Sequence, residues 1–443
     1  MYTTNSLSSL LVLLLLIIVI SAPNFTTLSA QKQVVLSGIL EDQGDPERWK
    51  SLILPAIKEL KDRHPDLEIQ MNYTTYPYNE MRERLLSAAK NHTVVDLVSL
   101  DQIWLGEFAE RGFLTDLTNY TKIWGRGDDW YQENWDGGFY NDKIYAIWAW
   151  TDIRGLWYWK DLLQKAGVDP NSMRTWDGYI QAAKKLNAVL RTQGIEGVHL
   201  VGASHSPDIE FYPYLWMQGG NIVELRTGHP TKGTYFFPTY NGSEGVKAME
   251  FIKAQIDAGV KPQKEHFWGK EFLDRKFAVM LEALQHHVRL NTTEQKRDFE
   301  QKVGFLPMFP VPTNLQYKTS SLMGGWEFSI PSTSNHKDLA WELITIMLEP
   351  SILAPYVVSH ANLPTQISIG EGSSYVLEAN KTIPYYDQLI NMINIGHSRP
   401  NIPEYPQIAE HIREALDEVY YGLKEPKQAL DDAAAKSAKV LGW

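Results

Sequence analysis

Residues 152–186 read DIRGLWYWKDLLQKAGVDPNSMRTWDGYIQAAKKL. Trp157 and Trp159 alternate with a tyrosine, as in a strand whose successive side chains point to opposite faces, and we expect both tryptophans to lie mainly in a core. Thr175 can cap a helix, because its hydroxyl accepts a hydrogen bond from a free N–H of the first turn, and Asp177 favours the positive end of that helix. The stretch therefore predicts a strand followed by a helix that begins after Thr175.

The chain before this stretch alternates strands with helices. We expect strands at residues 34–40, 67–73 and 94–100, and helices at residues 48–63, 78–91 and 103–111. This order predicts an α/β lobe with a largely parallel sheet. Ligands of such sheets bind at the loops that follow the carboxyl ends of the strands.

The chain after residue 186 continues in the same manner and ends in helices. Two glycines, Gly324 and Gly325, precede a short predicted strand that ends at Pro331. The further elements that we expect are strands at 143–150 and 303–309 and helices at 176–191, 244–258, 337–348, 408–420 and 427–440. No repeat or long linker separates these elements, which indicates one integrated unit.

Composition excludes several classes of protein. The chain has no cysteine, which excludes disulfides, thiol catalysis, thiolate metal sites and a bacterial lipoprotein anchor. Its net charge is −11 and no lysine or arginine run stands out, so we expect no nucleic-acid partner. The 15 tryptophans and 22 tyrosines suit large cores, and they equally suit stacking on the apolar faces of sugar rings.

No catalytic signature is present. The sequence lacks a G-x-S-x-G elbow, an H-E-x-x-H helix and a phosphate loop. His286 and His287 are adjacent, so on a helix their side chains would point about 100° apart, which is poor metal geometry. We therefore expect no metal, no cofactor and no enzyme. Paired carboxylates for glycoside hydrolysis are brought together only in space, so that alternative stays open.

The first thirty residues contain no charged side chain, and an apolar run extends from Leu10 to Ile20. The run fits the core of a signal peptide and is short for a membrane span of about 20 residues. We expect residues 1–30 to be a signal peptide or an N-terminal anchor and the protein to be extracellular or at the cell surface. Export also fits the glycosylation motifs N-x-S/T, at Asn24, Asn72, Asn91, Asn119, Asn241, Asn291 and Asn380.

Residues 152–186 resemble the central signature of the family 1 extracellular solute-binding proteins, the relatives of maltose-binding protein. Their pattern is a strand ending in an acidic residue, an aromatic-rich crossing strand, a "KDL…AG" helix and a "TW" pair before the next helix. Five further stretches resemble family segments in the same order: residues 96–117, 214–224, 320–350, 398–416 and 427–436. The resemblance covers nearly all of residues 34–443.

The resemblance implies a two-lobed α/β fold of the periplasmic-binding-protein type (type II), with mostly parallel sheets flanked by helices and a ligand cleft between the lobes. Chain crossings are expected near residues 152–157, 320–323 and 360–365. The first lobe would comprise residues 34–152 and 323–361, and the second lobe residues 155–320 and 364–443.

The resemblance also locates the candidate ligand-binding residues, which fall on cleft loops. Sugar recognition needs aromatic platforms and planar polar groups that bond pairs of hydroxyls. The carboxylates among the candidates have a helix cap or a surface charge as their alternative role, and the tryptophans have core packing. The candidates are Glu41, Asp42, Gln43, Asp101, Trp104, Trp148, Trp150, Asp152, Arg154, Trp216, Trp268, Trp326 and Arg399.

We expect Trp326 to be a stacking platform and not a core residue, because it follows two glycines at a crossing. Glu327 would then point the other way along the strand and is not a candidate. One departure from the family concerns the stretch FAVMLEALQHHV, where relatives often carry a stacking aromatic and this chain has Gln285 and His286. Either Trp268 or another loop replaces that aromatic, or the ligand is smaller or more polar than a maltodextrin.

These observations predict a binding protein that captures a mono- or oligosaccharide and delivers it by hinge closure to the permease subunits of an ABC transporter. We expect it to act as a monomer. The alternatives are the same fold with a non-sugar solute such as glycerol phosphate, a polyamine or a metal complex, a secreted glycosidase, and a structural or adhesion protein. A phosphate ligand would favour cationic loops, whereas the candidates here are mainly acidic and aromatic.

Overall fold

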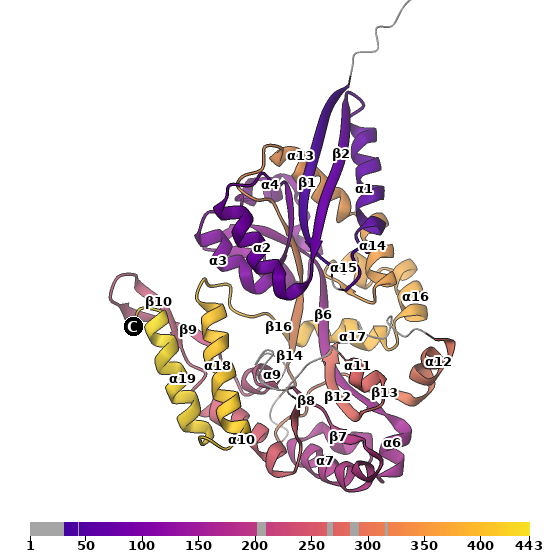
Figure 1. Ribbon diagram of the computed structural model, residues 1–443, viewed down its shortest axis with the longest axis vertical. Coiled ribbons are helices and arrows are strands. Elements are labelled where there is room, and N and C mark those ends of the chain that lie inside the picture. The colour runs from indigo at the N-terminus through magenta and orange to yellow at the C-terminus, as the bar shows by residue number, and fades with distance from the viewer. Residues whose placement is uncertain (1–30, 43, 202–209, 264–268, 284–291, 315–317) are drawn as a thin grey trace, which may run out of the picture.

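The computed structural model describes residues 31–42, 44–201, 210–263, 269–283, 292–314 and 318–443. They form two α/β lobes placed one above the other along the longest axis of the molecule (Figure 1). One main sheet runs through both lobes, and its strands follow the order β2 (Leu67–Tyr76), β1 (Lys32–Glu41), β3 (Leu97–Asp101), β14 (Ser321–Ser329), β6 (Ala146–Trp159), β12 (Phe277–Ala283) and β7 (Glu196–Val198).

The first lobe is built on the strands that the sequence predicted before residue 102. β1 (Lys32–Glu41) pairs in parallel with β2 (Leu67–Tyr76) and with β3 (Leu97–Asp101). β14 (Ser321–Ser329) returns antiparallel beside β3. The helices and short turns of this lobe are α1 (Lys50–Arg63), α2 (Tyr78–Lys90), η1 (Gln102–Trp104), α3 (Leu105–Glu110), α4 (Thr118–Trp124), η2 (Gly127–Asp129), α5 (Gln132–Asp136), α13 (Lys337–Met347) and α14 (Pro350–Ser359). α15 (Ile367–Gly370), which comes after the last expected crossing, contributes Ile369 to the hydrophobic core of this lobe.

One long strand, β6 (Ala146–Trp159), joins the lobes. Its first half pairs antiparallel with β14 and its second half pairs antiparallel with β12 (Phe277–Ala283) and β13 (Val303–Leu306). β15 (Leu363–Pro364) pairs with the middle of β6. A small hairpin, β4 (Phe139–Tyr140) and β5 (Lys143–Ile144), precedes β6. The quoted stretch therefore contains the strand that passes from one lobe to the other.

The second lobe packs helices around β6, β12, β13 and β7 (Glu196–Val198). Thr175 caps α7 (Trp176–Leu190), because its Oγ1 accepts a hydrogen bond from Gly178 N at 3.3 Å, as predicted. The other elements are α6 (Lys160–Lys165), η3 (Pro170–Arg174), η4 (Arg191–Gln193), β8 (Leu200–Val201), α9 (Tyr212–Trp216), β9 (Val223–His229), β10 (Gly233–Pro238), α10 (Ser243–Asp257), β11 (Pro262–Gln263), α11 (Lys270–Leu273), α12 (Thr293–Lys302), α16 (Ser373–Thr382), α17 (Tyr386–Met392), η6 (Ile393–Ile395), β16 (Gly396–His397), α18 (Tyr405–Tyr420) and α19 (Pro426–Val440).

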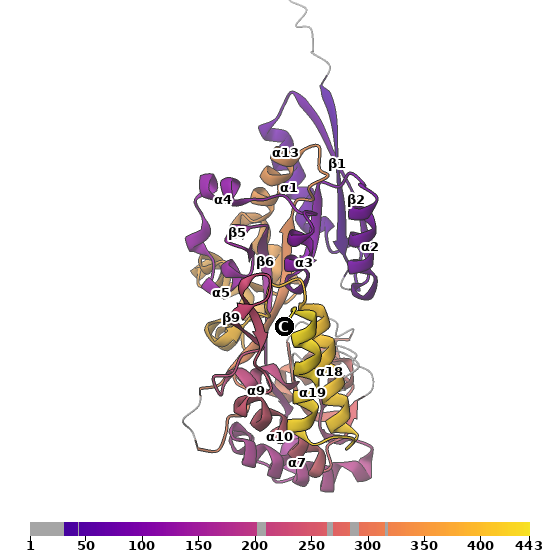
Figure 2. The same cartoon turned by 90° about the vertical axis from the view of Figure 1, so that its left-hand side faces the viewer.

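α18 and α19 lie side by side on the second lobe (Figure 2). α18 is strongly amphipathic, and its buried residues recur at helical spacing from Tyr405 through Ile408 and Ile412 to Val419. The loop between β16 and α18 is thereby fixed at its carboxyl end by the core of the second lobe.

Each lobe has its own hydrophobic core. The first core includes Leu36, Leu100 and Phe328, and the second includes Leu156 and Phe309. Trp157 and Trp159, which are 3% and 2% exposed, lie in the second core, so the prediction that they are core residues is confirmed. The α/β class is confirmed as well, while the exact lobe boundaries stay a prediction.

The glycine pair lies inside β14 and not before it, which differs from our expectation. Gly325 has φ of 152°, a value that favours glycine, and a Cβ there would lie 2.1 Å from Trp148 Nε1 and 2.3 Å from Trp150 O. The pair therefore continues the strand and lets the Trp148 indole pack directly on its backbone.

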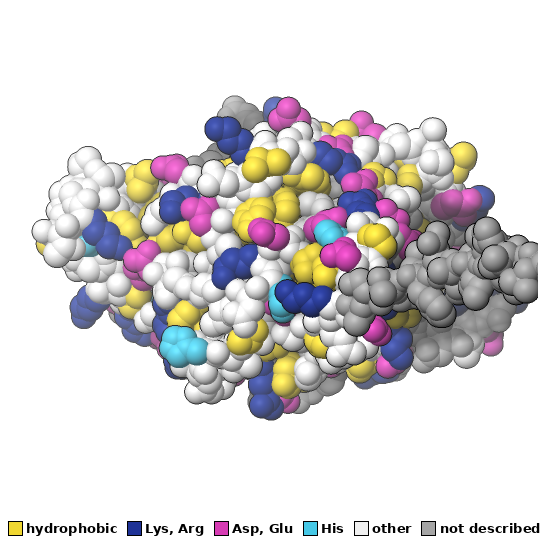
Figure 3. Space-filling view, turned by 90° about the horizontal axis from the view of Figure 1, so that it is seen from above, with side chains coloured by type: hydrophobic (Ala, Val, Ile, Leu, Met, Phe, Trp, Pro, Cys, Tyr) yellow, Lys and Arg dark blue, Asp and Glu magenta, His cyan; other side chains and the backbone are white. Residues whose placement is uncertain are grey.

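Within the described part of the chain, no individual helix has both the length and the apolar content to cross a membrane. α13 and α14 meet those criteria only as a pair, bent by 63°. Figure 3 shows the end of the molecule formed by the first lobe. Basic and acidic side chains alternate on the described part of this surface and form no basic patch.

Candidate functional site

The first wall of the candidate site lies where β3 ends. Asp101, the last residue of β3, accepts hydrogen bonds from Ile103 N at 3.3 Å and from the Tyr78 hydroxyl at 2.8 Å. Its side chain begins η1, so one carboxylate both starts a helical turn and holds a tyrosine. Only 7% of Asp101 is exposed.

Three aromatic rings stand beside this carboxylate. The Tyr78 ring stacks on Trp104 with 5.5 Å between centroids, and Trp326 meets both rings edge-on at 6.1 and 6.0 Å. Tyr78, Trp104 and Trp326 form what we call the aromatic wall. Of the three, Tyr78 is the most open, with 38% exposure.

Trp326 is 8% exposed and belongs to the first core. Our expectation that it stands apart from the core is therefore wrong, because Tyr78 and Trp104 cover it. A part in ligand binding stays a prediction for Trp104 and Trp326. Sequence reasoning missed Tyr78, whose one signal was its place at the start of α2, two residues after the end of β2.

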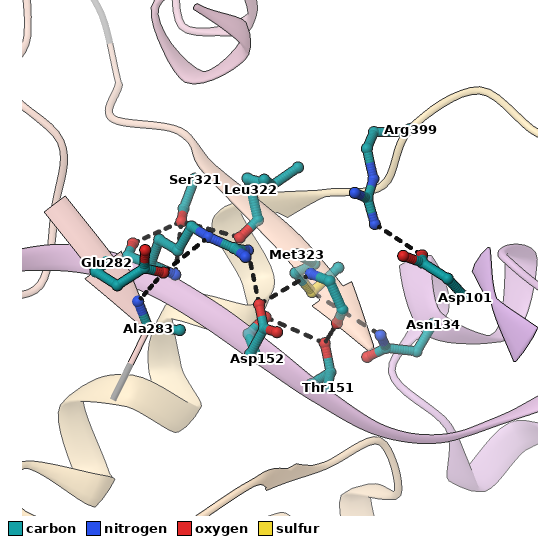
Figure 4. A network of polar contacts seen from close by, with 12 residues as sticks. Asp101, Asn134, Thr151, Asp152, Glu282, Ala283, Ser321, Leu322, Met323 and Arg399 are labelled. Atoms are coloured by element: carbon teal, nitrogen blue, oxygen red, sulfur yellow. Dashed lines mark hydrogen bonds and ion pairs between the residues drawn. The ribbon is translucent and has the colours of Figure 1, made fainter. Parts of the chain in front are cut away.

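A residue of the second lobe closes over Asp101. Arg399 lies between β16 and α18, and its Nη2 is 3.3 Å from Asp101 Oδ1, with both side chains at most 10% exposed (Figure 4). Gln102 Nε2 donates to the Arg399 carbonyl at 2.8 Å. Sequence reasoning selected Asp101 and Arg399 separately, and the structure brings them together across the two lobes.

A second charged group lies at the crossing on β6. Arg154 Nη1 is 2.7 Å from Asp152 Oδ1, and Arg154 Nε is 3.4 Å from Glu282 Oε1. Figure 4 shows Asp152 and Glu282 at this crossing. Asp152 also accepts a hydrogen bond from Gly324 N at 3.1 Å, while Ser321 Oγ donates to the Arg154 carbonyl at 2.6 Å. This crossing triad (Asp152, Arg154 and Glu282) therefore ties β6 to β12 and β14. The sequence analysis did not select Glu282, because it lies in a strand that is otherwise apolar and buried.

Two predicted tryptophans of β6 are 1% exposed. Trp150 packs in the first core, 5.5 Å from Trp49 and 5.1 Å from Tyr356 between ring centroids. Trp148 packs against Gly325 and Gly137, and its carbonyl accepts from Thr365 Oγ1 at 2.7 Å. In this arrangement neither ring presents a face to a ligand.

The loop after β1 has mostly structural contacts. Glu41 is 3% exposed; its N–H donates to Ser99 Oγ at 2.9 Å and its carbonyl accepts from Trp49 Nε1 at 2.7 Å. Asp42 Oδ1 accepts from Gly44 N at 2.7 Å, which is a local turn.

Trp216, at the end of α9, is half-buried and packs on His397, with 5.2 Å between the ring centroids. Burial lowers the pKa of His397, and the nearby Glu133 carboxylate opposes that shift. Trp216 also packs on Leu322 of β14, so it lies at the junction of the lobes.

Some predicted residues lie outside the described residues, namely Gln43, Trp268, Gln285, His286, His287, Asn24 and Asn291. Among the other glycosylation candidates, Asn72, Asn91, Asn119 and Asn380 are exposed and Asn241 is partly buried. Within the described ranges, no three His, Asp or Glu side chains gather as a metal site.

The two charged groups and the aromatic wall thus surround the junction between the lobes. Carboxylates and guanidinium groups there offer planar acceptors and donors, and the rings offer apolar faces. Such a surface can hold a polyhydroxylated molecule, since each hydroxyl needs a donor and an acceptor and each ring face needs an apolar partner.

Comparison with known proteins adds an independent finding. Residues 45–352 match the family model described as bacterial extracellular solute-binding protein. The arabinooligosaccharide-binding protein of Bacillus subtilis is 27% identical over 298 residues, covering 65% of this chain and 64% of that protein.

Solved structures share the fold. A solute-binding protein of Thermotoga lettingae bound to α-D-tagatose superposes with a TM-score of 0.74 at 23% identity, covering 93% of this chain and all of that one. UgpB of Mycobacterium tuberculosis with glycerophosphocholine gives 0.73 at 17% identity, covering 91% and 98%. The predicted two-lobed binding-protein fold is therefore confirmed, and the same fold carries both a sugar and a phosphodiester in these proteins.

Proposed function

Because this chain belongs to the bacterial extracellular solute-binding protein family, we propose that it captures a mono- or oligosaccharide between its lobes and hands it to the permease of an ABC transporter. The observation that carries the sugar assignment is the aromatic wall beside the Asp101–Arg399 pair. Stacking rings next to paired hydrogen-bonding groups suit a pyranose, which has apolar faces and a polar rim.

The charges at the junction favour a neutral ligand over a phosphate ester. Asp101, Asp152 and Glu282 outnumber the arginines Arg154 and Arg399, and each arginine already faces a carboxylate. Phosphate monoesters and phosphodiesters both carry negative charge on the phosphate group, and that group would need at least one cation that no carboxylate neutralises. Sugar hydroxyls, in contrast, bond well to carboxylates that are themselves held by arginine.

Capture depends on the ligand making more contacts in the closed arrangement of the lobes than in the open one. A ligand that touches both lobes stabilises the closed arrangement by the contacts that the open arrangement lacks. In this proposal the first lobe comprises residues 34–152 and 323–361, and the second comprises residues 155–320 and 364–443. The three crossings bend while each core stays rigid.

We propose that the protein returns its ligand unchanged, acts as a monomer outside the membrane and needs no cofactor. The apolar leader serves as its export signal or as its anchor. Four exposed glycosylation motifs, at Asn72, Asn91, Asn119 and Asn380, suit a protein that is modified after export.

A thermal-shift screen tests the function. The panel contains maltose, arabinotriose, D-tagatose, mannitol and glycerophosphocholine. We expect a sugar or sugar alcohol to raise Tm with its concentration, as RT ln(1 + [L]/Kd) requires. Chromatography after incubation should recover that ligand intact. Hydrolysis of a glycosidic bond would contradict the binding role, and a shift with glycerophosphocholine alone would contradict the sugar assignment.

A further inference from the structure

Glu327 of β14 is a buried carboxyl that the site described above does not use. None of its surface is exposed, and neither Oε1 nor Oε2 has a hydrogen-bond partner among the residues that the structure describes. It lies opposite Leu100 of β3 and opposite Trp148 of β6. A buried polar atom without a partner costs about 1–3 kcal/mol, and an isolated buried charge costs more. A glutamate at this position therefore destabilises the folded protein.

Three other buried polar atoms share this condition. Trp148 Nε1, Asn134 Oδ1 and Gln102 Oε1 have no hydrogen-bond partner within the described part of the chain, and Trp148 lies opposite Glu327 in the sheet. Trp148 packs on Gly137, whose carbonyl accepts from Asn401 Nδ2, and Gln102 contacts both Arg399 and Asn401. Gln102 therefore contacts the loop before α18 directly, and Trp148 is connected to that loop through Gly137.

The charged groups that act on Glu327 come from two elements. Asp101 ends β3, and Arg399 comes from the loop before α18. Burial raises the pKa of Glu327 well above its ordinary value, the negative charge of Asp101 raises it further, and the positive charge of Arg399 opposes them. The carboxyl is therefore neutral in this arrangement over a wider pH range than a solvated glutamate.

The cover over this region comes from the other lobe. Ile402 of this loop and Tyr405, the first residue of α18, pack in the second core, whereas Leu100 and Leu105 pack in the first. The loop meets α3 closely, since a Cβ on Gly106 would lie 2.8 Å from the Asn401 backbone. Separation of the lobes would remove Arg399 and Asn401 and let water approach Glu327.

We propose that Glu327 is a positioning residue for ligand capture and that closing the lobes on a sugar is linked to the uptake of one proton by this carboxyl. The inference rests on the proposed function and names a group that regulates the same site. Glu327 acts through the wall and the Asp101–Arg399 pair, and it does not itself touch the sugar.

The sign of the effect follows from the direction of the shift. An acid whose pKa is higher in the closed state holds its proton there at pH values where the open state has lost it. Closure is therefore unimpaired below the solvated pKa of about 4.3. Between that value and the raised pKa, each unit of rising pH weakens binding by up to tenfold, and above the raised pKa the dependence stops.

Calorimetric titration between pH 5 and 9 tests the proposal. The probe is whichever of maltose, arabinotriose and D-tagatose binds, and paired buffers of different ionisation enthalpy count the protons. We expect the wild-type chain to take up close to one proton within the linked range and to lose affinity as the pH rises. Glu327→Gln, a neutral isostere, should take up none and should bind more tightly than wild type at the upper end.

Glu378→Gln is the matched control, because Glu378 is an exposed acid of α16. It should behave as the wild-type chain does. Equal proton uptake in wild type and Glu327→Gln would overturn the proposal, although sugar binding itself would stand.

If no sugar binds, the proposed function fails, and solution scattering of the unliganded chains decides the proton link. A radius of gyration that grows with pH in wild type but not in Glu327→Gln supports it. Identical curves overturn it.

Discussion

Trp326→Ala should lower stability, because the indole is 8% exposed and covered by Tyr78 and Trp104. Truncating a buried tryptophan costs about 3–5 kcal/mol. With an unfolding entropy of about 2.1 cal/mol/K per residue, this lowers Tm by about 10–15 °C if a lobe of about 150 residues unfolds alone, and by about 3–5 °C if the whole chain unfolds together.

Differential scanning calorimetry measures this loss, and titration of the same preparation with the sugar measures affinity. Trp443→Ala is the control, since Trp443 is a half-buried tryptophan at the carboxyl end of the second lobe. It should cost less stability and leave the affinity unchanged. A Tm for Trp326→Ala equal to that of wild type would refute the packing of the aromatic wall.

Three further predictions concern the junction and the surface. Arg399→Met removes the cation that lies 3.3 Å from the buried Asp101 carboxylate, and breaking a buried ion pair costs about 3–5 kcal/mol, so scattering should record a larger radius of gyration; an unchanged radius would show that the pair does not hold the lobes. Arg154→Met removes the cation between the little-exposed carboxylates of Asp152 and Glu282, and it should lower Tm more than Arg297→Met, whose ion pair with Glu294 is exposed; equal losses from the two substitutions would contradict the charge argument. Glycan removal from native protein should lower its mass, with sites mapped first to exposed motifs such as Asn72, and an unmodified native mass would contradict glycosylation.

Elements governed by local sequence were predictable. The α7 cap at Thr175 and the strand–helix alternation before residue 102 depend on residues a few positions apart, and both are present. The pairing of Asp101 with Arg399 links positions 298 residues apart, so only the family resemblance brought both into the candidate site.

The remaining features depend on packing that no local pattern records. Pairing between β14 and β6 shifts register between Trp326 and Glu327, so simple alternation does not predict which neighbours each side chain meets. Tyr78 belongs to the site because it contacts residues that are 23 or more positions away in the sequence, such as Asp101. Glu282 belongs to the site because it contacts Arg154 on the crossing strand β6. The position of Trp150 also depends on packing, because its ring lies among the aromatic rings of the first core and does not face a ligand.

The central claim is that the junction of the lobes holds a sugar, and isothermal titration of the wild-type chain beside Asp101→Asn tests it most directly. This substitution keeps the shape of the side chain but removes the charge that faces Arg399. We predict one sugar bound per chain by the wild type, displacement of none of it by excess glycerophosphocholine, and an affinity at least tenfold weaker for Asp101→Asn. The same sugar affinity in both chains, or binding of glycerophosphocholine with no sugar bound, would contradict the account.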